Sequence, residues 1–321
     1  MSSGVPRGGA PFAHASLALA ALAVEALVGY PDRLHRRLPH PVVGLGALIN
    51  AGERCLNRPE RSPRARRLSG VATVVATAGV AALAGLVASR LPGPAPVLAA
   101  TLGLAQRSLY DHVAAVAKAL EVDDLPAART AVGMIVGRDT AELDASGVAT
   151  AAIESLAESF NDGVVAPAFW LALAGLPGLY AYKAVNTADS LIGHKEPRWK
   201  DFGWAAARTD DVMNLAPARL AGALIAMAGG GGWTVMLRDA RHHASPNAGW
   251  PEAAMAGALG VRLGGPVAYD GVMTDRPVFG EGPPPTVADL KRALNIYVRS
   301  TGLLWMAVAT LSSRGGRAWR R

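Results

Sequence analysis

Long apolar runs separated by short polar stretches dominate the pattern of this 321-residue chain. The runs cover residues 12–29, 69–91, 97–106, 164–182, 212–229 and 296–311. A helix needs about 20 apolar residues to cross a bilayer, and several of these runs approach that length. Strict alternation of apolar and polar residues, which would indicate strands, is absent almost everywhere. The pattern predicts an all-α fold, a polytopic helical membrane protein forming a single domain over 1–321, with flexible tails at 1–12 and 312–321.

The run 164–182 is interrupted, because it contains Pro167 and a Gly-Leu-Pro-Gly turn at 175–178. Two half-length helices joined at this turn fit better than one straight span. Irregular backbone at membrane depth survives only where protein buries it or where it lines a cavity. The sequence therefore predicts broken or re-entrant helices near a polar site. By contrast, the stretch 121–159 has normal charge density and predicts two solvent-side helices, about 124–136 and 140–159, the second capped by Asp139 or Thr140.

Charged residues make up only 18% of the chain and apolar residues 51%, against about 25% charged in an average soluble domain. Nine arginines oppose three acidic residues in 31–67, and four more lie in the last ten positions. This distribution is typical of cytoplasmic loops or of contacts with anionic lipid in the bilayer. Interleaved aromatic residues are missing from the basic loop, so a nucleic-acid partner is not expected. The single cysteine, Cys55, excludes a disulfide framework.

The first polar cluster of the middle region is Glu154-Ser-Leu-Ala-Glu158-Ser-Phe-Asn161-Asp162. Glu154 and Glu158 are four residues apart and share a helix face, where like charges repel unless a cation lies between them. Asp162 follows at the helix end, where the dipole disfavours anions. A Mg²⁺ site with Glu154, Glu158 and Asp162 as ligands is one interpretation. A solvated acidic face is the other.

Two further polar clusters follow in 183–214. The first places Lys183, Asn186 and Asp189 on one helical stripe, where they can bind a polar ligand or satisfy one another. The second cluster has many charged residues, with acidic and basic ones in similar number. Together with the loop before it, it contributes the candidates Lys195, Arg198, Asp201, Arg208, Asp210, Asp211 and Asn214. So many charged residues beside membrane helices indicate a functional site. A lone loop histidine, His194, is more typical of a surface residue.

Five blocks together resemble the adenosylcobinamide-phosphate synthase family of cobalamin biosynthesis, called CobD or CbiB. They are residues 29–53 with LPHPVVGLGALI, 137–144 (GRDTAELD), 152–167 (AIESLAESFNDGVVAP), 182–220, and 245–265 (SPNAGWPEAAMAGALGVRLGG). The chain departs from the family at Gly-Tyr-Pro-Asp in 29–32, where Gly-Asp-Pro is common, and at Ala157-Glu158-Ser159, where Ala-Glu-Asn is common. Glu158 and Asp162 are therefore stronger candidates than Ser159 or Asn161.

The resemblance implies an integral enzyme of the cell membrane whose polar site faces the cytoplasm. It would be an ATP-dependent ligase that joins adenosylcobyric acid, a corrinoid, to (R)-1-amino-2-propanol or its phosphate through an amide bond. Mg²⁺ and basic side chains would stabilise charge on the transferring phosphoryl group. The absence of a P-loop lysine motif and of an adenylate-forming signature favours release of ADP and phosphate.

On this resemblance, Glu154, Glu158 and Asp162 are the metal candidates, and Glu158 and Asp162 are also catalytic candidates. The substrate-binding candidates are Lys183, Asn186, Lys195, Arg198, Arg208 and Asn214. Four more carboxylates could orient these bases, bind a second metal or deprotonate the amine, namely Asp189, Asp201, Asp210 and Asp211. Partners would be the substrates, the bilayer and, as further candidates, a second copy or other cobalamin-pathway proteins. A transporter and a non-catalytic membrane signalling or accessory protein of related fold are the alternatives.

Overall fold

The computed structural model describes residues 10–29, 40–269 and 271–318, which are mostly helical. The chain divides into two compact units. Unit 1 comprises residues 1–105, 166–213 and 305–321, and unit 2 comprises residues 106–165 and 214–304. The units are described separately below.

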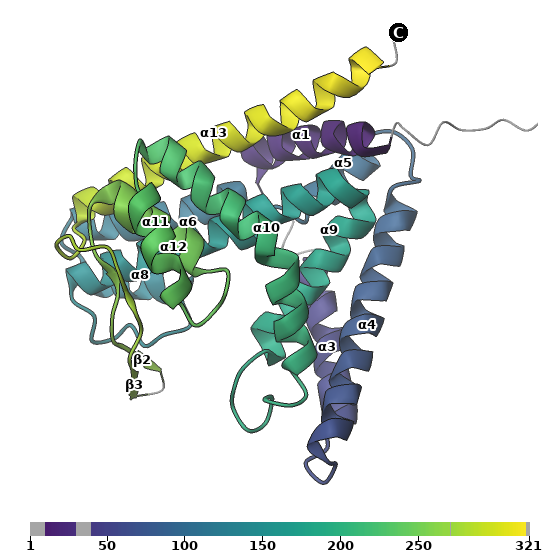
Figure 1. Ribbon diagram of the computed structural model, residues 1–321, viewed down its shortest axis with the longest axis horizontal. Helices are drawn as coiled ribbons and strands as arrows, with labels where there is room; N and C mark the ends of the chain where they lie inside the picture. The colour runs from purple at the N-terminus through teal and green to yellow at the C-terminus, as the bar shows by residue number, and fades with distance from the viewer. Residues whose placement is uncertain (1–9, 30–39, 270, 319–321) are drawn as a thin grey trace, which may run out of the picture. The chain divides into compact units, whose positions relative to one another are not determined.

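Helices make up unit 1. They are α1 (Ala10–Val28), α3 (Pro41–Leu56), α4 (Pro63–Ala88), α5 (Ala95–Thr101), α9 (Ala166–Ile192), the first part of α10 (Trp204–Gly229) and the last part of α13 (Val287–Ala318). Figure 1 shows α4 running beside α3 and the second half of α9. Glycines allow α4 to approach its neighbours closely, because a Cβ on Gly85 would lie 2.5 Å from the Leu176 carbonyl oxygen. Small residues serve this purpose at helix contacts in membranes.

The predicted break in the 164–182 run is confirmed. Gly175 has φ 66° and ψ −160° inside α9, so that α9 is two helical segments joined by a kink. Only glycine adopts this backbone conformation without strain. Pro177 follows inside the second segment, where it lacks the N–H of a regular helical hydrogen bond. In Figure 1 the chain of α9 changes direction sharply at the kink.

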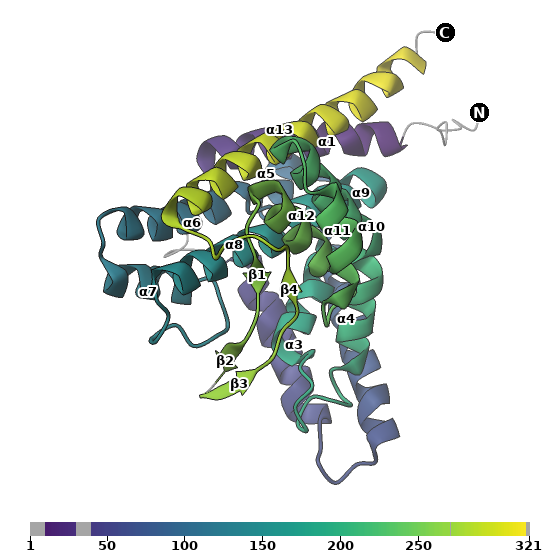
Figure 2. The same cartoon turned by 60° about the vertical axis from the view of Figure 1, so that its left-hand side comes forward.

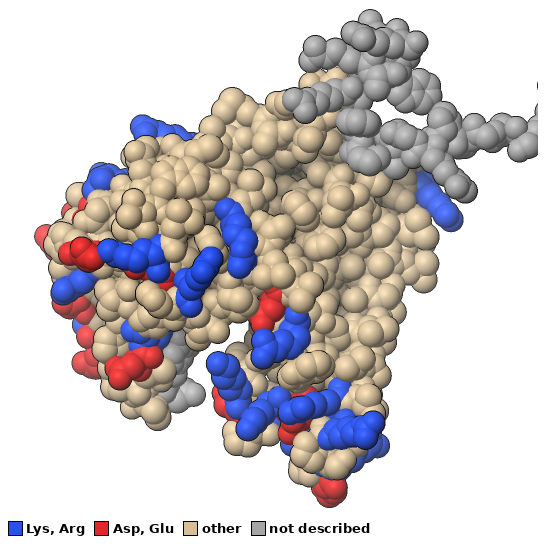
Figure 3. Space-filling view, in the orientation of Figure 1, with Lys and Arg blue, Asp and Glu red and all other residues tan. Residues whose placement is uncertain are grey.

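Three stretches are long and apolar enough to cross a membrane: Pro63–Ala88, Ala145–Ile192 and Trp204–Gly229. On α4 the side chains of Leu68, Val75 and Leu83 are 62%, 66% and 61% exposed, as expected for a helix that faces lipid. Figure 3 shows no charged side chain on the visible middle of α4, while Lys and Arg gather below it. The protein is thus an all-α polytopic membrane protein.

Unit 2 is also mainly helical. It contains α6 (Gln106–Glu121), α7 (Leu125–Gly133), α8 (Ala145–Phe160), a π-helical turn η1 (Asn161–Val165), the rest of α10, α11 (Trp233–Asp239), the 3₁₀ turn η2 (Ala240–His242), α12 (Gly249–Leu259) and most of α13. The expected solvent-side position is wrong for α8. Ten of its side chains are buried, because its many alanines pack closely with neighbouring helices. The N-cap of α8 is Asp144, whose side chain accepts a hydrogen bond from the Gly147 N–H. The predicted caps, Asp139 and Thr140, are therefore wrong.

Four short strands of two or three residues each are the exception in an otherwise helical fold, and no strand signal in the sequence predicted them. They are β1 (Leu263–Gly264), β2 (Val267–Tyr269), β3 (Val272–Thr274) and β4 (Val278–Phe279). β1 pairs with β4 and β2 with β3, both antiparallel, so the four form one long hairpin arm (Figure 2). Strands of two or three residues are too short to show alternation in the sequence.

Other boundaries differ in detail from the sequence prediction. The run 97–106 is not one helix, because α5 ends at Thr101 and α6 begins at Gln106. Residues 10–12 and 312–318, assigned to the predicted tails, are helical in α1 and α13. The rest of both tails, and the Tyr-Pro-Asp of 30–32, lie outside the described residues.

Candidate functional site

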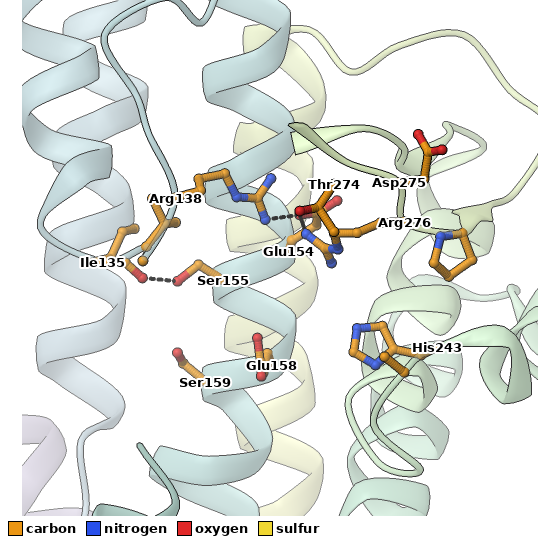
Figure 4. Close-up of a pocket in the computed structure, with 14 residues that line it drawn as sticks. Ile135, Arg138, Glu154, Ser155, Glu158, Ser159, His243, Thr274, Asp275 and Arg276 are labelled. Atoms are coloured by element: carbon orange, nitrogen blue, oxygen red, sulfur yellow. Dashed lines mark hydrogen bonds and ion pairs between the residues drawn. The ribbon is translucent and has the colours of Figure 1, made fainter. Parts of the chain in front are cut away.

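A cavity of about 440 Å³ lies within unit 2, and we call it the unit 2 pocket. Ligand-binding pockets typically have volumes of about 300–1,000 Å³. Four segments line the pocket: the loop after α7, the middle of α8, the residues after η2 and the connection between β3 and β4. Figure 4 shows their polar side chains turned toward the same space. The pocket is therefore the first place to look for chemistry in this unit.

Helix α8 supplies the acidic wall of the pocket. Glu154 and Glu158 lie one turn apart on the same face, with Ser155 and Ser159 beside them. The Ser155 hydroxyl donates to the Ile135 carbonyl at 2.8 Å, which ties α8 to the loop after α7. The sequence correctly predicted that the two glutamates share a face.

Glu154 is 2% exposed and joins three segments of unit 2. Its Oε2 accepts hydrogen bonds from Arg138 and, at 3.1 Å, from Nη1 of Arg276. Its Oε1 accepts from the Gly264 N–H at 2.6 Å. Gly264 has φ 84°, and a Cβ there would lie 2.0 Å from the Pro277 carbonyl oxygen, so this contact requires glycine.

The two arginines come from opposite sides of the pocket. Arg138 lies in the loop between α7 and α8, and its side chain is 10% exposed. Arg276 lies between β3 and β4 and is 16% exposed. Its Nη2 also pairs with Oε2 of Glu252 on α12 at 3.4 Å. Two nearly buried guanidiniums therefore converge on one buried carboxylate.

Glu252 and His243 complete the charged surroundings. Burial, together with the charges of Glu154 and Glu158, raises the pKa of Glu252 well above its usual range. Burial and the Arg276 guanidinium lower the pKa of His243. Nδ1 of His243 accepts from the Ser245 N–H at 2.9 Å and lies 3.3 Å from the Ser245 carbonyl oxygen, while Nε2 lies 3.7 Å from Oε1 of Glu252. The backbone at Ser245 therefore fixes the ring with its Nε2 toward Glu252.

Glu158 differs from Glu154 and Glu252 because its carboxylate forms no hydrogen bond or ion pair within the described part of the chain. It lines the pocket, and the charges of Glu154, Asp162, Arg138 and Arg276 act on it. Asp275 also lines the pocket, but it is exposed on the hairpin arm and points away from Glu154 (Figure 4). Glu158 is thus the pocket carboxylate on α8 that is available to a ligand.

A second polar group follows at the π-helical turn η1. Nδ2 of Asn161 donates to Oδ1 of Asp162 at 2.7 Å and to Oδ1 of Asn214 at 2.9 Å. Asn161 is 3% exposed, and its Oδ1 has no hydrogen-bond partner. Single π turns within helices occur often at functional sites. The structure thus joins the predicted residues Asp162 and Asn214 through Asn161, which the sequence ranked lower.

The expected Mg²⁺ set is not assembled in this arrangement. Among residues 10–29, 40–269 and 271–318, no group of three or more His, Cys, Asp or Glu side chains is placed to hold a metal ion. Both oxygens of Glu154 already accept hydrogen bonds from Gly264 and the two arginines. Glu154 is therefore better placed to position Arg138 and Arg276 than to bind a metal ion.

Unit 1 contains the other predicted residues. Nζ of Lys183 lies 3.4 Å from Oδ1 of Asn186, whose Nδ2 lies 3.4 Å from Oδ1 of the buried Asp210. These three residues form one polar group between α9 and α10. Asp189 lies further along α9, close against Gly193.

The remaining candidates of unit 1 form ion pairs near the loop 193–203. Arg198 binds Glu53 through two hydrogen bonds, of 2.9 and 3.0 Å, and Arg67 binds Asp201 at 2.9 Å. Arg208 lies 3.5 Å from Asp211 within α10, and Lys195 is exposed. Most of these candidates therefore have protein partners that account for their charge.

Sequence reasoning did not select Arg138, His243 and Arg276, which line the unit 2 pocket, or Glu252, which pairs with Arg276 from α12. Arg138 and Glu252 lie inside two of the blocks that resemble the family, and Glu252 is an isolated charge in an apolar stretch. A single charge in an apolar stretch could have identified Glu252 as a candidate from the sequence. Arg276 and His243 come from a hairpin and a loop whose contacts are long-range, and nothing local in the sequence marks them.

Comparisons with known proteins agree with this picture. The profile of the CobD/Cbib protein family matches residues 18–297. The chain is 47% identical to the cobalamin biosynthesis protein CobD of Rhodobacter capsulatus over 308 residues, covering 93% of this chain and 97% of that protein. It is 51% identical to the protein of the same name from a Sinorhizobium species over 285 residues, covering 84% and 88%. No solved structure matches the chain. The chain belongs to the CobD/CbiB family.

Proposed function

We propose that this protein is an enzyme of cobalamin biosynthesis that joins adenosylcobyric acid to (R)-1-amino-2-propanol or its phosphate through an amide bond. The observation that carries the proposal is the match, over 93% of the chain, to a protein named cobalamin biosynthesis protein CobD. The unit 2 pocket supports it, because it combines an available carboxylate with two buried guanidiniums. ATP would drive the reaction, since a free carboxylate is a poor acyl donor.

The dimensions of the pocket suit part of the corrinoid. At about 440 Å³ the pocket has the size of a site for a drug-sized ligand, and a whole corrinoid is larger. A propionate arm and the amine can meet inside it while the macrocycle stays outside. This arrangement would keep water from the activated carboxylate.

The proposed reaction has two steps, formation of an acyl phosphate and formation of the amide. An oxygen of the substrate carboxylate bonds to the γ-phosphorus of ATP and ADP leaves, which forms an acyl phosphate. The amine nitrogen then bonds to the acyl carbon, phosphate leaves and one proton is lost from nitrogen. Mg²⁺ would enter with the nucleotide and neutralise phosphate charge when bound.

The amine must attack as the free base, yet alkylamines have pKa values of about 10 and are protonated near neutral pH. An acceptor must therefore take one proton from the ammonium group before the attack, in addition to the proton released when the amide forms. Glu158 is the best-placed acceptor in the pocket, since Arg276 occupies Glu252 and Glu154 serves two arginines. Nδ1 of His243 is held by the Ser245 backbone, and its Nε2 faces Glu252. Among the carboxylates predicted in 183–211, Asp201 and Asp211 have basic partners, and Asp189 and Asp210 belong to unit 1 and do not line the pocket, so we propose Glu158 as the base in place of that group.

A purified-protein assay tests the function. The detergent-solubilised chain is offered adenosylcobyric acid, Mg-ATP and either amine, and corrinoid and nucleotide products are measured. We expect an amide product, with ADP and phosphate formed in step. Absence of product with both amines would refute the function, and AMP as the main nucleotide product would refute the acyl phosphate.

Replacing Glu158 tests the proposed base. Glu158→Gln should lower turnover by about 10²- to 10⁴-fold, the usual contribution of a positioned base. The matched control is Glu142→Gln, which changes an exposed carboxylate outside the pocket and should leave turnover unchanged. Retention of wild-type turnover in Glu158→Gln would move the base elsewhere.

We further propose that the site faces the cytoplasm, because the basic segments are those expected on that side and the substrates are cytosolic. Cys55 is exposed, and a Ser190→Cys change in a Cys55→Ser background places a second probe on α9. Neither thiol should react with an impermeant reagent in intact cells, although both should react after lysis. Labelling in intact cells would contradict this orientation.

A further inference from the structure

Arg138, one of the two arginines of the unit 2 pocket, uses few of its hydrogen-bond donors within the described part of the chain. A guanidinium has five N–H donors. Within the described part of the chain, the only hydrogen bond that Arg138 donates goes to Oε2 of Glu154, although its side chain is only 10% exposed. Arg276 shares that same oxygen. One carboxylate oxygen therefore serves two cations, and the other donors of Arg138 have no protein acceptor within the described residues and are not enclosed by protein.

Among the described residues, no nitrogen of Arg138 is both buried and without a hydrogen-bond partner, so the donors that Glu154 does not take up reach accessible space. The pocket provides that space, because Arg138 and Arg276 both line it, and an acceptor bound there can take up these donors. A guanidinium is a planar fork that matches the paired oxygens of a carboxylate or phosphate. Figure 4 shows the two guanidiniums close together at Glu154.

We propose that Arg138 and Arg276 form a binding site for an oxyanion, either a carboxylate or a phosphate, and that Glu154 is the positioning residue that holds both guanidiniums for it. The identity of the oxyanion rests on the proposed function, which offers two candidates, the corrinoid carboxylate and the γ-phosphate of ATP. The existence of an oxyanion site does not depend on that function.

The location of Arg276 gives the site a particular construction. Arg276 is carried by the hairpin arm, and Glu154 also binds the first strand of that arm through Gly264. The same carboxylate thus fixes the arm and aims the guanidinium that the arm carries. A bound oxyanion would add an acceptor for Arg138 without displacing Glu154, since the one hydrogen bond that the Arg138 side chain donates in the described structure uses a single nitrogen, and it would meet Arg276 on the same pocket wall.

Binding is measured first without turnover. The full-length protein in detergent is heated with increasing inorganic phosphate or with propionate, a simple carboxylate, and its melting temperature is recorded against matched chloride. We expect a saturable increase with at least one probe. Arg138→Gln should abolish it, and Arg138→Lys should weaken it because lysine lacks the fork. The control, Arg262→Gln, removes an exposed arginine of unit 2 and should show the same increase in melting temperature as the wild type.

Kinetics then identify the oxyanion. With free aminopropanol as the amine, Arg138→Lys should raise KM for ATP or for adenosylcobyric acid by roughly 10- to 100-fold, the effect of losing a charged hydrogen bond. A rise for ATP assigns the phosphate, and a rise for the corrinoid assigns the carboxylate. If Arg138 variants fail to fold, Arg276→Lys, on the hairpin arm, is measured in the same two ways.

The outcomes separate the two proposals. A saturable phosphate or propionate effect that Arg138→Gln removes supports the oxyanion site even if no amide forms. Amide formation by wild-type protein, with unchanged KM values in Arg138→Lys and Arg276→Lys, overturns the site while the function stands. Equal probe effects in wild type and Arg138→Gln, or no probe effect in wild type, also overturn it.

Discussion

Glu53 in unit 1 and Glu154 in unit 2 are both buried carboxylates bound by arginine, but they are bound differently. Glu53 accepts two hydrogen bonds from one arginine, Arg198, and one from Asn57 at 3.1 Å. The Arg198 side chain is 62% exposed. Glu154 receives two arginines from separate segments, at most 16% exposed, and both line a cavity.

The difference separates a structural contact from a site. At Glu53 the donors and acceptors match one another, and the group fastens the loop 193–203 to α3, where Asn57 also donates to the Arg198 carbonyl at 2.9 Å. At Glu154 two arginines from separate segments share one carboxylate, and all three side chains line a cavity. Charged side chains that converge on a cavity, rather than the densest charges in the sequence, indicate where a ligand binds.

The largest effect is expected from removing the shared carboxylate. Glu154→Gln should lower the free energy of unfolding by about 3–5 kcal/mol, as breaking a buried ion pair does, because Arg138 loses the carboxylate it is paired with and Arg276 keeps only Glu252 of its two carboxylate partners. Urea or thermal unfolding in detergent measures it. Turnover of any folded fraction should fall too, since both arginines lose their positions.

The matched comparison is Glu158→Gln, four residues along the same helix. It removes a carboxylate without a hydrogen-bonded partner in the described structure, so stability should change little while turnover is lost. Equal destabilisation by the two variants would show that the two carboxylates do not differ as described.

A smaller effect is expected at Glu53. Hydrogen bonds from Arg198 hold the pKa of Glu53 below its usual value of 4.5. A carboxyl whose pKa is lowered by folding stabilises the protein above its unfolded pKa, and that contribution is lost as the pH falls through the folded value. Glu53→Gln should therefore reduce the loss of stability below about pH 4.5 and leave turnover near the wild-type rate.

Arg198→Gln completes this test of the structural role. Exposed ion pairs stabilise proteins little, so the double-mutant cycle with Glu53→Gln should give a small coupling, and Arg198→Gln should remain active. Loss of turnover with normal folding in Arg198→Gln would restore Arg198 to the substrate-binding group that the sequence suggested.

The smallest effect concerns His243, whose pKa is lowered by burial and by Arg276. The unfolded chain then takes up a proton near the usual pKa of 6.5, before the folded chain does, so stability falls as the pH drops below that value. His243→Gln should flatten the melting-temperature profile between about pH 6.5 and 5. An unchanged profile would show that His243 titrates normally in the folded protein.

The sequence predicted much of the helical fold because apolar runs and helix breakers act locally. The break at Gly175 and the shared face of Glu154 and Glu158 were both readable from spacing. The burial of α8 was not, because its alanines and polar residues do not by themselves show which neighbours cover them. The hairpin arm was missed because its strands are held by long-range pairing rather than by alternation.

The site was predictable only in part, for a related reason. Charge density directed attention to 183–214, where the structure pairs Arg198, Asp201, Arg208 and Asp211 within unit 1. Arg138 and Arg276 lie 138 positions apart in the chain and meet at Glu154, a relation that no local pattern encodes. The metal, nucleotide and individual catalytic roles stay predictions.

The kink at Gly175 bears on how the chain enters the membrane. It leaves helical segments of 9 and 17 residues within α9, which at about 1.5 Å per residue reach roughly 14 and 26 Å. Neither segment matches a hydrocarbon core of about 30 Å. The backbone groups released at the break also need protein around them, and Leu176 there is covered by α4. The break in α9 therefore depends on α4 for cover, so the two helices form one packing unit in which neither is independent of the other.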